Sequence, residues 1–148
     1  MSFFWSKVGK DVQELKEYEE SLVKQYKLYI DYLNDSIKTL GKALFNDANL
    51  NSSDKDSLQK FYVICVRCLC SLIERLSHFN YANDLIESVV RQLTSKINEV
   101  SHLASDTIIN LYKTDKDLQL TLEITQKLTK MIRQKSYGVK SEVNLNCI

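Results

Sequence analysis

Residues 69–90 read LCSLIERLSHFNYANDLIESVV, and this stretch decides the fold class. An apolar helix tail runs into a polar and aromatic corner, and a second helix begins behind Asn83 and Asp84. The apolar residues recur at three- to four-residue spacing on both sides of the corner: Leu69, Leu72, Ile73 and Leu76, then Leu85, Ile86, Val89 and Val90. A unit of two helices, each with one apolar face, is typical of helical repeat proteins.

The composition favours long helices. The chain of 148 residues has no proline and three glycines, and these two residue types are the main helix breakers. The 20 basic and 19 acidic residues leave a net charge of +1, which indicates neither a general nucleic-acid binder nor an acidic tail. Apolar runs are too short to span a bilayer, so we expect no contact with a membrane.

We predict an all-α fold with a long first helix, built as a HEAT- or armadillo-like stack of helical hairpins. Residues 1–10 form an N-terminal segment and residues 11–148 a single helical domain. The first helix keeps an apolar stripe from Val8 to Leu44 in which only Glu19 is missing. Five to six helices are expected, at about Gly9–Phe45, Asp54–Ser77, Asp84–Thr94, Ile97–Lys113, Thr114–Ser136 and from Ser141 onward.

A faint internal repeat supports this stack. Shifting the chain by 35 residues superposes apolar positions of the second helix on those of the fourth, for example Tyr62 on Ile97. This spacing is in the range of helical-hairpin repeats. Two amphipathic helices in any all-helical protein can also align in this way, so the repeat stays an open alternative.

The corner Ser77-His78-Phe79-Asn80-Tyr81 resembles a motif of the nucleolar complex-associated protein 3 family, which carries leucine, proline, histidine, phenylalanine, asparagine and an aromatic residue there. Three further stretches are similar to the family in the same order: LKEYEESLVKQYKLY at 15–29, DTIINLYKTDK at 106–116 and YGVKSEV at 137–143. Ser77 and Ser141 replace family prolines, so a looser corner is expected. The family's proteins are much longer, which implies that this chain is a domain of a larger protein.

The resemblance implies a non-enzymatic scaffold domain in the nucleus and nucleolus that acts in assembly of the large ribosomal subunit. The implied partners are a relative of nucleolar complex-associated protein 2 and pre-ribosomal particles. The family is also linked to replication-initiation complexes on chromatin. The residues alone indicate only a helical interaction module without a cofactor.

Two helix faces are candidate binding surfaces. On the first helix, tyrosines at intervals of three form an amphipathic band that is suited to anchoring a partner, unless it packs under a neighbouring helix. This partner surface comprises Lys24, Lys27, Leu28, Tyr29 and Tyr32. On the fifth helix, Lys127, Lys130 and Arg133 are spaced to meet RNA or DNA phosphates, unless they form an ordinary solvated face.

The residue pattern does not indicate an enzyme. His78 and His102 are the only histidines, and neither has a nucleophile and an orienting carboxylate beside it in the sequence. We expect His78 to bind helix-end carbonyls at the corner. Three cysteines, Cys65, Cys68 and Cys70, lie within one apolar helix and are interpreted as buried thiols in a reducing compartment rather than as metal ligands.

At the corner we predict that Phe79 or Tyr81 is largely buried between the second and third helices. Asn80 or Asn83 is expected to cap the third helix. A contact face is expected to stay open on the first helix or at the C-terminal end, where Val139, Val143, Leu145 and Ile148 gather.

Overall fold

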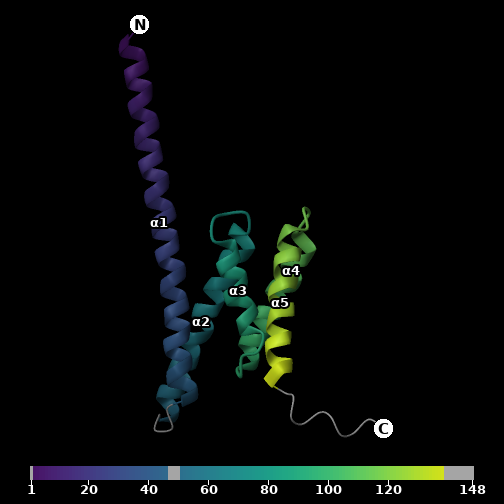
Figure 1. Ribbon diagram of the computed structural model, residues 1–148. Helices are drawn as coiled ribbons and strands as arrows, with labels where there is room; N and C mark the ends of the chain where they lie inside the picture. Colours follow the sequence, from purple (N-terminus) through teal and green to yellow (C-terminus); the bar gives the residue numbers. More distant parts are fainter. Residues whose placement is uncertain (1, 47–50, 139–148) are drawn as a thin grey trace.

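The computed structural model describes residues 2–46 and 51–138, and the side chains of 12–46 and 51–134. Within these ranges the chain is all-α, which confirms the predicted fold class (Figure 1). The five helices are α1 (Ser2–Asn46), α2 (Ser52–Leu76), α3 (Ala82–Gln92), α4 (Asn98–Thr114) and α5 (Gln119–Gly138). The predicted sixth helix from Ser141 lies outside the described residues.

The first helix is long, as predicted, but it begins at Ser2 rather than near Gly9. A single glycine inside a helix costs only about 1 kcal/mol, so the apolar and charged residues around Gly9 carry the helix through it. With 45 residues at about 1.5 Å each, α1 is roughly 68 Å long. Residues 2–10, which the sequence set apart as a segment, are therefore continuous with the rest of α1.

The helices pack in chain order. α1 packs against α2, α2 against α3 and α4, α3 against α4 and α5, and α4 against α5. Contact of α2 and of α3 with the next two helices along the chain is compatible with a HEAT-like stack, which stays a prediction. None of the helices in the described part of the chain combines the length and the apolar composition that a bilayer span requires.

The core forms where the apolar faces of all five helices meet. Its members include Ile30, Leu33 and Ile37 of α1, Val66, Leu69 and Ile73 of α2, Leu85, Ile86 and Val89 of α3, Val100, Ala104 and Leu111 of α4, and Ile124 of α5. α1 and α2 approach each other at Gly41, where an added Cβ would lie 3.4 Å from the Tyr62 ring, at the edge of ordinary contact. The Tyr62 hydroxyl donates a buried hydrogen bond of 2.8 Å to Gln92 Oε1, which ties α2 to α3.

The N-terminal half of α1 rises beyond the other helices (Figure 1). Its apolar residues Val12, Leu15 and Leu22 belong to the predicted stripe, yet all three are exposed. From Ile30 onward the stripe is buried against α2. The sequence therefore predicted the stripe correctly, but only its C-terminal half lies in the core.

The cysteines agree only in part with their interpretation as buried thiols. Cys70 is buried, whereas Cys65 and Cys68 are half-buried, and all three are free. In the described residues no three potential metal ligands gather at one place.

Candidate protein-binding surfaces

The corner between α2 and α3 differs from its prediction. Phe79 keeps 37% of its surface exposed, and Tyr81 is half-buried. Their rings lie against Tyr26 of α1, with ring centroids 5.4 Å and 6.3 Å from the Tyr26 ring, and Tyr81 also packs against the core. The prediction was wrong for Phe79, which is exposed, and Tyr81 meets it only in part; it also left out α1, which is distant in sequence and offers the aromatic neighbour. The corner thus ties α3 to α1.

The start of α3 also differs from its prediction. The N-cap position is Tyr81, which has a left-handed φ of 67° and makes no side-chain cap hydrogen bond. Neither Asn80 nor Asn83 caps the helix; both are exposed. A tyrosine in this conformation is strained, and its packing on Tyr26 stabilises it.

His78 is exposed beside the corner. The carbonyl of Leu76 at the end of α2 accepts its hydrogen bond, 3.0 Å long, from the backbone N–H of Phe79. Among the described residues, the imidazole makes no hydrogen bond to a helix-end carbonyl, so that expectation was wrong. The backbone N–H of Phe79 already satisfies the Leu76 carbonyl, so no side-chain donor is needed there.

The residues of the predicted partner surface on α1 have different environments, and Lys27 differs from the other four. Lys27 pairs with Asp31 at 2.5 Å and with Asp84 of α3 at 3.6 Å, and it lies 5.4 Å from the centre of the Tyr81 ring. The hydrogen bond from Lys27 to Asp31 is the main reason why its pKa is raised. Lys27 is therefore engaged in holding the corner.

The other four residues of that surface are exposed, but they face two ways. Tyr29 lies beside Cys68 of α2, where partial burial first and the hydrogen bond to Cys68 second raise its pKa. Leu28 and Tyr32 are four residues apart and so share one side of α1. Lys24 is also exposed, a turn closer to the N-terminus. Leu28 and Tyr32 form the apolar part of the surface that is open to a partner.

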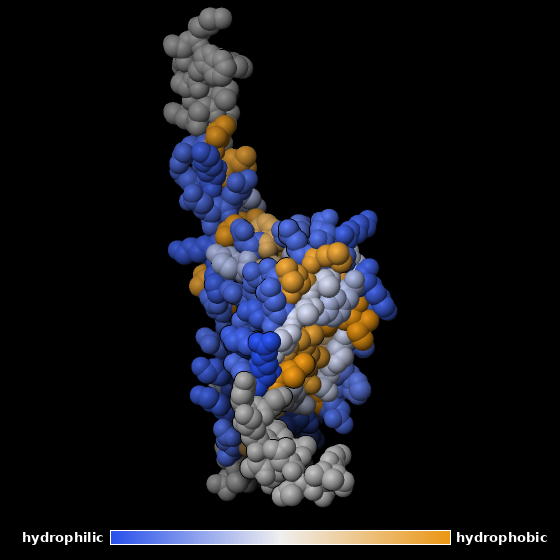
Figure 2. All heavy atoms as spheres, turned by 45° about the vertical axis from the view of Figure 1, so that its right-hand side comes forward, coloured by the Kyte–Doolittle hydropathy of each residue, from blue (hydrophilic) through white to orange (hydrophobic). Residues whose placement is uncertain are grey.

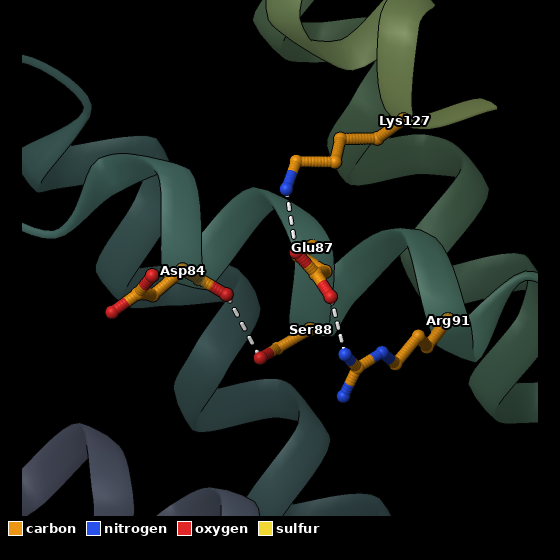
Figure 3. A network of polar contacts seen from close by, with 5 residues as sticks. All are labelled: Asp84, Glu87, Ser88, Arg91 and Lys127. Atoms are coloured by element: carbon orange, nitrogen blue, oxygen red, sulfur yellow. Dashed lines mark hydrogen bonds and ion pairs between the residues drawn. The ribbon is translucent and has the colours of Figure 1, made fainter. Parts of the chain in front are cut away.

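The predicted basic face on α5 is also divided (Figure 3). Lys127 reaches across to α3 and donates a hydrogen bond of 2.5 Å to Glu87, whose other oxygen accepts from Arg91. Lys130 and Arg133 are exposed and line a shallow groove of about 400 Å³ on α5. Lys127 thus holds α5 to α3, and two of the three basic residues are open to a ligand.

Glu87 was missed by the sequence reasoning, although it joins α3 to α5. The hydrogen bond from Lys127 chiefly lowers its pKa, and Arg91 adds to the effect. Glu87 and Arg91 carry the helical spacing of four that signals an ion pair, but Lys127 lies 40 residues away. Local sequence therefore indicates the Glu87–Arg91 pair but not the Glu87–Lys127 pair.

Hydrophobic side chains also mark the part of α1 that rises above the body (Figure 2). They are Val12, Leu15, Tyr18 and Leu22, each about half exposed or more. An exposed row of this kind is uncommon on a helix that packs only against its own chain. The sequence placed most of this row in the apolar stripe of the first helix, but periodicity alone does not show where the covering helix ends.

The chain is similar in sequence to several known nucleolar proteins. Nucleolar complex protein 3 homolog of Danio rerio is 32% identical over 146 residues, which cover 97% of this chain and 18% of that protein. Its counterpart in Xenopus laevis is 31% identical over 141 residues, 93% of this chain and 17% of that protein. The chain is homologous to nucleolar complex protein 3. The motif resemblance is thereby confirmed.

The relationship extends beyond vertebrates. Nucleolar complex-associated protein 3 of Schizosaccharomyces pombe is 30% identical over 142 residues, 93% of this chain and 17% of that protein. The chain spans less than a fifth of the length of these curated relatives. No family model matches it. The relatives' names indicate a nucleolar, and therefore nuclear, location, and they are not names of enzymes.

Proposed function

We propose that this chain is a non-enzymatic helical scaffold domain of a nucleolar protein, and that it acts in assembly of the large ribosomal subunit by binding partner proteins. The observation that carries the proposal is the exposure of apolar side chains on two parts of α1: Val12, Leu15, Tyr18 and Leu22 in one row, and Leu28 with Tyr32 nearer the middle of the helix. Contiguous apolar surface on a folded domain usually marks a contact. The names of the relatives, which place those proteins in a nucleolar complex, support it.

The proposed partner is a relative of nucleolar complex-associated protein 2, with pre-ribosomal particles as cargo. Replication-initiation proteins on chromatin are a further proposed partner group. Leu28 and Tyr32 are the residues with which we test the contact, together with Lys24. Lys27 is unsuitable for this purpose, because reversing its charge would also break its pairs with Asp31 and Asp84.

A capture experiment with purified components tests the proposal. The double variant Leu28→Glu and Tyr32→Glu should lose capture of the partner while its melting temperature stays unchanged, since both side chains are exposed. The matched control is Ile132→Glu on α5, which is also exposed and should keep capture. Full capture by the double variant would place the contact away from this side of α1.

The alternative function is direct contact with RNA or DNA. The exposed pair Lys130 and Arg133 on the α5 groove favours it. Phosphate contacts of this type bind shape and charge rather than sequence, and their affinity falls steeply with salt.

A further inference from the structure

The exposed stripe of α1 has the spacing of a helix–helix seam. Val12, Leu15, Glu19, Leu22 and Tyr26 follow one another at steps of three and four residues, which places them on one side of the helix. Alternate steps of three and four are the pattern with which one helix packs along another. The polar member is Glu19, at the middle of the exposed part.

α2, which covers the C-terminal half of α1, ends at Leu76, while the seam on α1 continues beyond that point. Tyr26 meets the rings of Phe79 and Tyr81, which follow the end of α2. Beyond that point Val12, Leu15 and Leu22 expose 48%, 56% and 50% of their surface. The seam therefore continues the α1–α2 interface past the end of α2, and one more helix of about four turns would complete it.

The charged residues near the seam indicate which charge a bound helix should carry. Residues 12–26 carry four glutamates, Glu14, Glu17, Glu19 and Glu20, against two lysines, Lys16 and Lys24, and of these charged residues Glu19 lies within the seam. Below the seam, the aromatic corner opens into a groove of about 780 Å³ between the corner and the start of α5. Its charged lining is mostly acidic and comprises Glu74, Asp84, Asp115, Asp117 and Glu123 with Lys116.

A second copy of α1 fits this surface poorly. Aligned on the same seam, it would bring its own Glu19 against Glu19, and like charges across an interface oppose binding. A helix with an apolar face and an excess of lysine or arginine removes that repulsion. A single charged residue within an apolar seam also fixes register and partner choice.

We propose that residues 12–26 of α1 dock a basic amphipathic helix of another protein. Its apolar side chains cover Val12, Leu15 and Leu22, and one of its cations pairs with Glu19. Its end reaches the acidic groove beside Phe79. The inference rests on the proposed scaffold function and specifies the site and the chemistry of the bound segment.

Site-specific photo-cross-linking in cells, with the protein as it is expressed there, tests this docking. A photoreactive residue replaces Leu15 in one experiment and Glu17, on the opposite side of the helix, in the control. Mass spectrometry then reads the sequence of the attached segment. We expect Leu15, and not Glu17, to cross-link to a segment of another protein with apolar residues at three- to four-residue spacing and net positive charge.

Charge reversal tests the role of Glu19. Glu19→Lys should lower the Leu15 cross-link about tenfold, the effect of losing one interfacial charge pair, whereas Glu17→Lys should leave it unchanged. Replacing the facing cation of the captured segment with glutamate should restore the cross-link to Glu19→Lys.

Several outcomes would overturn the proposal: attachment to a second copy of α1, to nucleic acid, to an acidic segment or to nothing, and equal effects of the two reversals. The scaffold function would survive those outcomes if Leu28→Glu with Tyr32→Glu still abolished partner capture. The two proposals therefore fail separately.

Discussion

Tyr62 shows how one polar side chain specifies the packing of α2 against α3. Its hydroxyl and Gln92 Oε1 form a hydrogen bond inside the core, where both residues are buried and burial raises the pKa of Tyr62. A buried polar group that loses its partner keeps its desolvation penalty. The pair therefore disfavours a shift of α3 along α2.

Replacing Tyr62 with phenylalanine should destabilise the fold by about 1–2 kcal/mol, because the buried amide of Gln92 loses its donor. Urea denaturation measures this as a lower midpoint at unchanged slope. Tyr32→Phe is the control, since Tyr32 is exposed, and it should leave the midpoint unchanged. Equal midpoints for wild type and Tyr62→Phe would show that the bond contributes nothing to stability.

Glu87 should make stability depend on pH. Its pKa is lower in the folded chain than the ordinary value of 4.5, so its contribution is present above pH 4.5 and is lost as the pH falls through the folded pKa. Glu87→Gln should therefore be less stable than wild type at pH 7, and the difference should shrink below pH 4.5. Urea midpoints at both pH values measure it. A difference that does not change with pH would contradict the ion-pair interpretation.

At the scale of the helices, α1 has one apolar stripe with two environments. Ile30 is fully buried against α2, whereas Leu22, eight residues earlier on the same stripe, is half exposed. The sequence cannot distinguish them, because both fit the same helical period. What distinguishes them is the end of α2 at Leu76, which sets how far α1 is covered.

Ile30→Ala should cost about 3 kcal/mol, since it leaves a cavity in the core. Leu22→Ala should change the free energy of unfolding by less than about 0.5 kcal/mol, because its side chain is exposed. Chemical denaturation of both variants compares the two halves of the stripe. A similar cost at the two positions would mean that the N-terminal half of α1 is covered within the chain.

The helix boundaries show what local sequence determines. The second helix was predicted at Asp54–Ser77 and is found at Ser52–Leu76, because polar loop residues and the apolar period are local signals. The conformation of Tyr81 and the position of Phe79 were not predictable in this way. They depend on Tyr26, which only the folded chain brings to the corner.

The same distinction applies to the candidate surfaces of the whole molecule. The sequence offered Leu28, Tyr32, Lys130 and Arg133 as candidate surface residues and left packing under a neighbouring helix open for the first two; in the structure all four are exposed. The engagement of Lys127 with Glu87 did not follow from the sequence, because it depends on how α5 packs on α3. Composition and motifs indicated the relatives, but the open seam on α1 became visible only when the end of α2 was located.

The nucleic-acid alternative gives a prediction for the whole domain. If it holds, Lys130→Glu with Arg133→Glu should weaken RNA binding and lower the salt slope by about 2, one unit for each lost phosphate contact. Fluorescence anisotropy against salt concentration measures both. Leu28→Glu with Tyr32→Glu is the control and should leave RNA binding unchanged. Equal RNA affinity for wild type and the Lys130→Glu, Arg133→Glu variant would remove this alternative.

Amide hydrogen exchange of residues 12–26, in the free chain and in the complex with the captured nucleolar partner, tests most directly whether a partner helix docks on the exposed seam of α1. Exchange there should be fast in the free chain, because few tertiary contacts hold this part of α1 closed. In the complex we predict that it slows by at least about tenfold, since a docked helix prevents local opening. Unchanged exchange in residues 12–26, with protection confined to α5, would contradict the docking of a partner helix on this seam.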